Sequence, residues 1–253
     1  MAVIGIMSAL HEELAAVLAD MPDEQRVVVA GRDFWQGQWQ GHAVVAVLSR
    51  IGKVAAATTA TVMLERFGVD ALVFTGAAGV LGPGVRVGDV VVARGFIQHD
   101  MDASPLFPRY EVPLYGRALF EADAVLSLQL AEAAQQVLQA AERHLGPETL
   151  AQFQLSSPKV HQGLIVSGDR FVSNHAESQA LRESLPEALA VEMECAAVAQ
   201  VCLDYGVPFA AVRTISDRAD DTAHTDFNRF IREVASRYSR AILSQWLTCR
   251  QPV

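Results

Sequence analysis

The sequence predicts an α/β protein with a mixed or mostly parallel β-sheet that helices cover on both faces. Short apolar runs, which suit buried strands, alternate along the chain with segments of helical period. Hydrophobic residues make up 51% of the 253 residues, which is ample for a full core. The sequence shows no internal repeat and no low-complexity linker, so we expect one domain over residues 1–253.

The first half of the chain contributes most of the expected strands. Each is an apolar, often β-branched run next to a turn that contains glycine. The expected strands are residues 2–8, 27–30, 34–38, 43–48, 71–75 and 87–92. Helices are expected at residues 11–20 and 53–67, and Gly76–Gly79 is expected to form a loop after its strand.

The second half begins with a segment of a different kind. Residues 103–117 are rich in Pro, Tyr and Phe without a clean period, which is typical of a functional loop or a disordered one. The elements expected after it are a long helix at 122–145, strands at 160–167, 190–192 and 209–215, and helices at 194–204 and 227–246.

Composition and charge exclude several classes of function. The net charge is −9 and no Lys/Arg-rich run occurs, which argues against nucleic-acid binding. The three widely spaced cysteines, Cys195, Cys202 and Cys249, argue against a disulfide scaffold or a zinc site. The apolar N-terminus lacks a basic region, and no run approaches the ~18 apolar residues of a membrane span. We therefore expect a cytoplasmic protein with no membrane partner.

Polar side chains follow several of the apolar strands. Glu12 and Glu13 follow the first strand, Ser167-Gly168-Asp169 follows another, and Ser216-Asp217 ends the strand that contains Arg213. Ligands of open α/β sheets bind at the carboxyl ends of the strands. The pattern therefore predicts an active-site rim.

Each acidic motif allows a structural and a functional interpretation. Glu12 and Glu13 either complement a helix dipole or supply a general base. Glu192 and Glu194 either cap a helix or include a carboxylate that binds two ribose hydroxyls, since a buried acid needs partners. The Arg213–Asp217 segment holds either a structural Arg–Asp pair or a catalytic Asp.

Two further motifs have simpler interpretations. His99-Asp100-Met101-Asp102 is a weak metal signal, so a loop-ordering role is expected and no metal is predicted. The turn at Ser167-Gly168-Asp169 either closes its strand or presents Phe171 and Val172 as an apolar wall for a flat ring.

Seven segments, in order from the first strand to the last, together resemble the 5′-methylthioadenosine/S-adenosylhomocysteine nucleosidases. The segments are residues 4–14, 50–57, 75–79, 88–92, 163–172, 191–194 and 213–217. The resemblance covers nearly the whole chain. It implies a purine-phosphorylase-like fold, in which the central mixed sheet is partly closed and flanked by helices. It also implies a homodimer in which loop 103–117 lines the partner's 5′-thio pocket.

The resemblance implies hydrolysis of the N-glycosidic bond of both nucleosides without a cofactor. It assigns Glu13 as the base that activates water, Asp217 as the acid that protonates the purine N7, and Arg213 as a residue that positions the water. Glu194 is expected to bind the ribose hydroxyls. The expected substrate site is completed by Met193 under the sugar, Phe171 and Val172 at the adenine, Phe227 at the ribose and 5′ side, and Ala77 and Ser216. Ala77 stands where many members of the family have serine.

Three alternatives remain open at this stage. A phosphorylase of the same fold would need cationic groups near the sugar, whereas here Leu10-His11-Glu12-Glu13 follows the first strand. A nucleosidase for another adenine nucleoside, such as a futalosine-type substrate, is harder to separate. A non-catalytic nucleoside-binding protein would bind the same ligands without releasing adenine.

Overall fold

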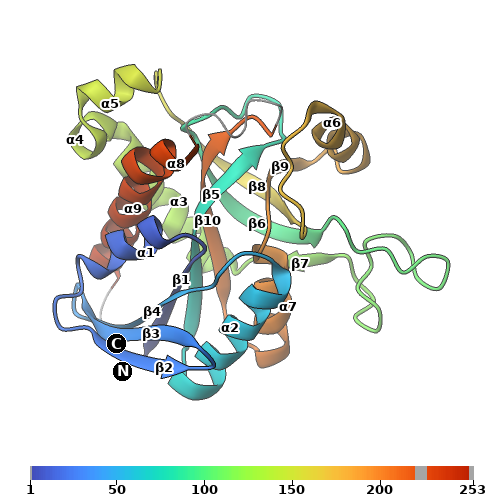
Figure 1. The fold of residues 1–253 in the computed structure, drawn as a ribbon, viewed down its shortest axis with the longest axis horizontal. Coiled ribbons are helices and arrows are strands. Elements are labelled where there is room, and N and C mark those ends of the chain that lie inside the picture. Colours follow the sequence, from blue (N-terminus) through green and yellow to red (C-terminus); the bar gives the residue numbers. More distant parts are fainter. Residues whose placement is uncertain (1, 220–226, 251–253) are drawn as a thin grey trace.

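The computed structural model describes residues 2–219 and 227–250, and its centre is one mixed β-sheet (Figure 1). Within these residues, the strands are β1 (Val3–Ser8), β2 (Gln25–Val29), β3 (Arg32–Trp39), β4 (His42–Leu48), β5 (Ala71–Val80), β6 (Val90–Gln98), β7 (Leu119–Glu121), β8 (Val160–Ser167), β9 (Ala188–Glu192) and β10 (Phe209–Asp217).

The sheet closes on itself at one end. Its strand order is β10-β6-β8-β9-β5-β1-β4-β3-β2, with β7 added to β6. Strand β10 also pairs with β5 in parallel, so β5, β9, β8, β6 and β10 form a closed ring. Strands β1, β4, β3 and β2 extend from this ring as an open sheet. This architecture confirms the predicted fold class, a partly closed mixed sheet flanked by helices.

Helices cover both faces of the sheet (Figure 1). The helices are α1 (His11–Leu18), α2 (Lys53–Phe67), α3 (Ala124–Gln139), α4 (Ala141–Leu145), α5 (Pro147–Gln152), α6 (His175–Ser184), α7 (Cys195–Tyr205), α8 (Phe227–Phe230), a π-helical turn (Ile231–Ala235) and α9 (Ser236–Cys249). No helix in the described residues is long and apolar enough to cross a membrane.

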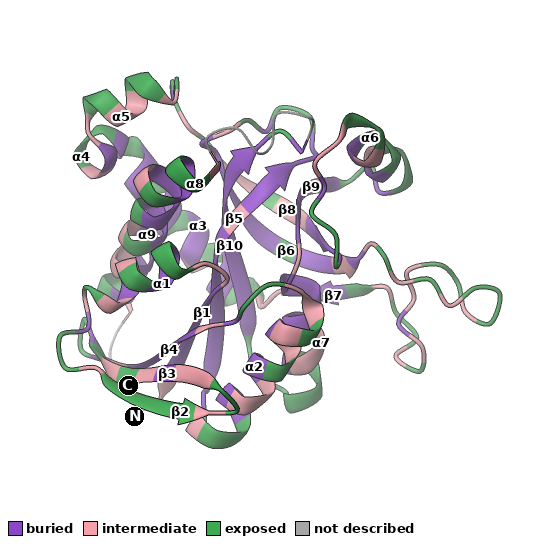
Figure 2. Cartoon of the chain, viewed as in Figure 1, coloured by how far each residue is buried: buried purple, intermediate pink, exposed green. Residues whose placement is uncertain are grey.

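The two faces of the sheet have separate cores because successive strand residues point to opposite faces. In β5, Val73 packs into the core that includes Leu130 of α3 and Ile242 of α9. Its neighbours Leu72 and Phe74 pack into the core of α2 and α7. Strands β5 and β10 are buried along almost their whole length, as Figure 2 shows.

The expected loop at Gly76–Gly79 is wrong, because these residues continue β5. Gly76 and Ala77 lie opposite Arg213 and Thr214 of β10, and Gly79 pairs with Val191 of β9. The turn signal of the glycines is overridden because β10 pairs with β5 along this stretch and β9 joins it at Gly79. The small residues bring the backbone of β5 close to neighbouring side chains instead of turning it.

The expected helix at 122–145 is also partly wrong. It ends at Ala140, whose φ of −108° and ψ of 29° leave the helical region, and α4 follows. Helix α6 was missed, although Asn174 is a good N-cap residue and its side chain accepts a hydrogen bond from the Glu177 amide at 2.8 Å. Strand β7 and helix α5 were missed because both are short.

The segment between β6 and β7 contains residues 103–117 and projects away from the rest of the molecule (Figure 1). Leu106 and Leu114 on it are 84% and 94% exposed. Large apolar side chains held in solvent on an extended loop indicate a contact surface.

Candidate active site

An open cleft lies where the carboxyl ends of β1, β5, β9 and β10 meet. Of the predicted site residues, the cleft is lined by Glu13, Ala77, Phe171, Val172, Met193, Glu194, Ser216, Asp217 and Phe227. We call it the reaction cleft. Arg213 is the one predicted residue that lies behind its wall.

Glu13 lies in the first turn of α1 and is fully buried, whereas its neighbour Glu12 is exposed. Its Oε2 accepts a hydrogen bond from the Leu10 amide at 3.2 Å. Among the described residues, its Oε1 has no hydrogen-bond partner. Burial raises the pKa of Glu13 to about 7, although the Arg213 charge opposes the shift. A carboxyl that titrates near neutrality suits a general base.

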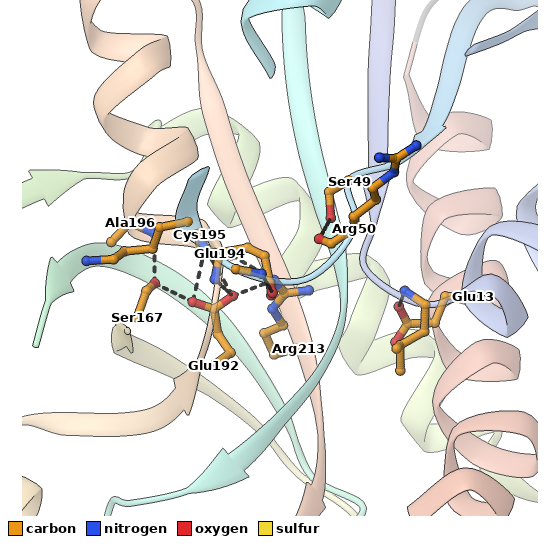
Figure 3. A network of polar contacts seen from close by, with 12 residues as sticks. Glu13, Ser49, Arg50, Ser167, Glu192, Glu194, Cys195, Ala196 and Arg213 are labelled. Atoms are coloured by element: carbon orange, nitrogen blue, oxygen red, sulfur yellow. Dashed lines mark hydrogen bonds and ion pairs between the residues drawn. The ribbon is translucent and has the colours of Figure 1, made fainter. Parts of the chain in front are cut away.

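Arg213 is completely buried on β10, with its guanidinium 4.3 Å from the centre of the Phe74 ring. Its Nη2 donates to Glu192 Oε2 at 2.6 Å (Figure 3). The structural Arg–Asp pair considered from the sequence is therefore not formed, because Arg213 pairs with Glu192. Gly76 makes room for this arrangement, since a Cβ there would collide with Arg213 Nη1 and lie 3.2 Å from both Glu13 oxygens.

Glu192 is the site residue that the sequence interpretation did not assign. Its carboxylate also accepts hydrogen bonds from Ser167 Oγ and from the Glu194 and Cys195 amides (Figure 3). Burial opposes its ionisation, but the Arg213 charge and these hydrogen bonds lower the pKa of Glu192. Its position in the sequence could have indicated a site residue. Glu192 directly follows the buried Ala190 and Val191 at a strand end, where an acid needs a partner.

Glu194 follows at the start of α7 and faces the reaction cleft. Its Oε1 accepts a hydrogen bond from the Gly52 amide at 2.9 Å, and its Oε2 lies 3.8 Å from Arg213 Nη2. Burial and the neighbouring Glu192 charge raise the pKa of Glu194 to about 8. Its ionised form therefore gains from any ligand that donates hydrogen bonds to it.

Asp217 ends β10 and is held in place by its neighbours. Ser216 Oγ donates to its Oδ2 at 2.7 Å, and the Ala219 amide donates to its Oδ1 at 2.8 Å. A Cβ at Gly79 would come within 2.9 Å of Asp217 Oδ1, so this glycine lets β5 pass close to the acid. The carboxyl is thus oriented at the rim of the reaction cleft.

The apolar part of the reaction cleft can take a flat ring. Phe171 and Phe227 meet edge to face, with ring centres 5.9 Å apart and ring planes inclined by 76°. Val172 and Met193 line the cleft with them, and Leu10 and Ile51 add apolar surface that the sequence interpretation did not assign. Aromatic side chains in this arrangement bind flat, weakly polar ligands.

A set of polar contacts outside the cleft joins α2 to the turn before Phe171. Lys53 Nζ donates to Asp100 Oδ1 at 2.6 Å, and Asp100 Oδ2 accepts from the Asp169 amide at 2.9 Å. Asp169 Oδ1 in turn accepts from the Lys53 amide at 2.7 Å. The His99–Asp102 motif therefore orders the loops, as expected. The described residues contain no cluster of three His, Cys, Asp or Glu side chains that could hold a metal ion.

A partly closed mixed sheet with an acid-lined cleft at its strand ends is the architecture to compare with known protein families. The chain belongs to the phosphorylase superfamily, whose family model matches residues 3–247. The particular relatives are nucleosidases, which confirms the family resemblance seen in the sequence. A 5′-methylthioadenosine/S-adenosylhomocysteine nucleosidase of Marinomonas sp. (strain MWYL1) is 35% identical over 98% of this chain and 99% of that protein.

Solved structures give the same result. The structure of the corresponding nucleosidase from Neisseria meningitidis, in complex with methylthio-immucillin-A, matches with a TM-score of 0.85 and 30% identity, over 99% of this chain and 100% of that one. Futalosine hydrolase of Helicobacter pylori also matches, with a TM-score of 0.82 and 31% identity, over 96% of this chain and 97% of that one. The fold thus serves nucleosidases that differ in substrate.

Proposed function

We propose that this chain hydrolyses the N-glycosidic bond of 5′-methylthioadenosine and S-adenosylhomocysteine and releases adenine. The observation that carries the proposal is the convergence of Glu13, Glu194 and Asp217 in one cleft, although they lie far apart in the sequence. The names of the relatives support the choice of substrates. The proposed steps use side chains of this chain and no cofactor.

The sugar becomes an oxocarbenium-like cation when the glycosidic bond breaks, as in other glycoside hydrolysis. Adenine is a poor leaving group as an anion. In our proposal the Asp217 carboxyl gives its proton to the purine N7, so that adenine leaves as a neutral molecule. Ser216 and the Ala219 amide hold this carboxyl in position. A general acid of this kind contributes roughly 10²–10⁴-fold to the rate.

Glu13 removes a proton from the attacking water on the opposite side of the sugar. Its unpartnered Oε1 is suited to accept this proton, and its pKa of about 7 lets much of the carboxyl ionise at neutral pH. Arg213 lies beside Glu13 across Gly76, which supports a role in positioning the water and Glu13 together.

Glu194 accepts hydrogen bonds from the ribose 2′ and 3′ hydroxyls, with Met193 packed beneath the sugar. These hydroxyls become stronger donors as the ribose loses electron density, so the contact strengthens in the transition state. Ala77 completes this part of the site. Phe171 and Val172 bind the adenine, while Phe227, Leu10 and Ile51 form the apolar side that receives the 5′ substituent.

We further propose that residues 1–253 act as one domain in a cytoplasmic homodimer. The three cysteines are free thiols, and Cys249 is exposed, which fits a reducing compartment. The exposed Leu106 and Leu114 on the loop 103–117 support its packing against a second copy near that copy's 5′ pocket.

Adenine release from 5′-methylthioadenosine with and without inorganic phosphate tests the reaction. We expect full activity without phosphate, whereas phosphorolysis would require it. Phosphorolysis needs cationic groups that bind phosphate near the sugar, whereas an ionised Glu13 carboxylate in the reaction cleft would repel it. Asp217→Asn is expected to lower the rate at least 100-fold with an unchanged circular dichroism spectrum. Near-normal release by Asp217→Asn would refute its role as the acid.

A further inference from the structure

A second, wider cleft lies beside the reaction cleft. The two share Ala9, Leu10 and Ile51, so they join at the apolar side that the proposed function gives to the 5′ substituent. Beyond this junction the wall becomes polar, with His11, Glu12, Arg32, Asp33 and Arg50. We call this second cleft the tail cleft.

Two guanidinium groups in the tail cleft lack a counter-ion. Among the described residues, neither Arg32 nor Arg50 forms an ion pair with a carboxylate. Asp33 lines the same cleft, but it pairs with Arg26 at 2.8 Å. Arg50 Nη2 donates to the carbonyl of Gly31, the residue before Arg32, so the two cations are neighbours. Partial burial and the Arg50 charge lower the pKa of Arg32. Two neighbouring cations without a carboxylate partner among the described residues favour an anion between them.

The two arginines are held differently. Arg32 is fixed by Nε donating to Thr59 Oγ1 at 2.6 Å and by Nη1 donating to the Ala30 carbonyl at 3.1 Å. Arg50 is exposed, and its Nη2 donates to the Gly31 carbonyl. Figure 3 shows Arg50 reaching away from the Glu192–Arg213 network. Each guanidinium carries five N–H donors, so both retain donors for a ligand.

The backbone at Arg50 gives an independent indication. Its φ is 65°, in the left-handed region, where glycine is free and a residue with a Cβ is disfavoured. An arginine at such a position costs stability that glycine would not. Backbone outliers of this kind cluster at functional sites, where the side chain has a use.

We propose that the tail cleft binds the carboxylate of a nucleoside whose 5′ substituent carries one, with Arg50 and Arg32 as its donors. The inference rests on the proposed function. S-adenosylhomocysteine has such a carboxylate in its amino-acid tail, whereas 5′-methylthioadenosine ends in a methyl group. Arg50 therefore determines specificity among substrates and takes no part in bond cleavage. The exposed carboxylate of Glu12 lies in the same cleft, where the tail's ammonium group finds an opposite charge.

Arg50→Gly tests this assignment with little risk to folding, because glycine suits a φ of 65°. We expect KM for S-adenosylhomocysteine to rise roughly three- to tenfold at low salt with kcat unchanged. Hydrolysis of 5′-methylthioadenosine and of decarboxylated S-adenosylhomocysteine is expected to stay as in the wild type. A 5′-carboxyalkylthio analogue that lacks the amine is expected to show the same sensitivity as S-adenosylhomocysteine.

Arg66→Ala is the matched control, since it removes the same charge from an exposed position outside both clefts. An equal rise in KM for 5′-methylthioadenosine in Arg50→Gly, an equal effect of Arg66→Ala, or no change for S-adenosylhomocysteine would overturn the assignment. If the wild type released adenine from none of these nucleosides, the proposed function itself would fail, which is a separate outcome.

Discussion

Three carboxyl groups share one buried cation, and the way they share it determines their chemistry. Arg213 makes its short contact with Glu192, which keeps Glu192 ionised. Glu194 is farther away, with its Oε2 at 3.8 Å from Arg213 Nη2. Glu13 forms no direct ion pair with Arg213, but the Arg213 charge still lowers its pKa. Burial therefore dominates at the last two residues and raises their pKa values to about 8 and about 7. Glu192 therefore stays ionised beside Arg213, whereas Glu13 and Glu194 can change their protonation state near neutral pH.

Glu13→Gln tests the base. Because the free carboxyl must ionise to accept a proton, wild-type kcat/KM is expected to rise about tenfold per pH unit below pH 7 and then level off. The variant is expected to lose at least 100-fold in kcat at pH 8, where the wild-type carboxyl is ionised, and less as the pH falls below 7. Adenine release measured between pH 5 and 9 checks both results. A rate that does not vary with pH in the wild type would contradict this assignment.

The stability of the wild type is expected to fall with rising pH, opposite to its activity. The folded-state pKa of Glu13 is raised from 4.5 to about 7, so its protonated form stabilises the fold below pH 4.5, and this contribution is lost as the pH rises through 7. The shift corresponds to about 3 kcal/mol. Thermal melting is therefore expected to show that Glu13→Gln gains Tm relative to wild type at pH 8, and not at pH 4.5.

At the residue scale, polar side chains after several strands indicated where the cleft lies, and the family resemblance then assigned most of its residues. Glu13, Glu194 and Asp217 were all located in this way. Glu192 and Arg50 were not assigned to the site, because their importance depends on partners from distant segments and on a backbone angle. Spacing in one sequence does not show such partners.

Strand β5 is the element that brings the site together, since it pairs with β1, β9 and β10. The sequence predicted its beginning from the apolar run, but read Gly76–Gly79 as a loop. Glycine signals a turn locally, whereas here it allows Arg213 and Glu13 to approach the strand. Whether a glycine forms a turn or allows a close approach depends here on packing against distant segments, which the local sequence does not show.

Gly76→Ala is expected to disturb this packing. The added Cβ meets Arg213 Nη1, which cannot move aside because Arg213 is completely buried. We expect a loss of about 1–3 kcal/mol in the free energy of unfolding, measured by urea denaturation, together with a large loss of kcat. Gly68→Ala is the control for kcat, because alanine is also strained at its φ of 59° but the added Cβ meets nothing within 4 Å. Equal kcat values for the two variants would show that Gly76 does not position the site.

The contacts that join α2 to the turn before Phe171 are expected to position substrate. Asp100→Asn weakens the ion pair with Lys53, which is partly buried and lies beside the turn. We expect KM for 5′-methylthioadenosine to rise roughly threefold or more with little change in kcat. Asp102→Asn is the matched control, since the Asp102 side chain contacts Ser104 on the exposed loop. Equal KM values for both variants would contradict the positioning role.

At the scale of the whole molecule, the alternation of strands and helices was enough to predict a mixed, helix-covered sheet. The ring closure came from the family resemblance, because 128 residues separate the end of β5 from the start of β10 and no local pattern reports their contact. The loop 103–117 was predicted as an irregular segment, and the structure shows it projecting from the molecule (Figure 2).

Leu106→Asp tests the proposed assembly. A charge on this 84% exposed apolar side chain is expected to convert a dimer to a monomer in sedimentation analysis and to lower kcat/KM for 5′-methylthioadenosine at least tenfold. Leu128→Asp on α3, which is 54% exposed, is the control for surface charge. A monomeric wild type of full activity would refute the homodimer.

The closed ring has a consequence for how molecules enter and leave. The strands that carry Asp217, Glu192 and Gly76 are joined edge to edge by backbone hydrogen bonds through β5. Moving these strands apart would break this ladder, so we expect the ring to stay closed while substrate binds and product leaves. Nucleoside and adenine are then expected to pass the side of the reaction cleft where Phe171 and Phe227 meet edge to face.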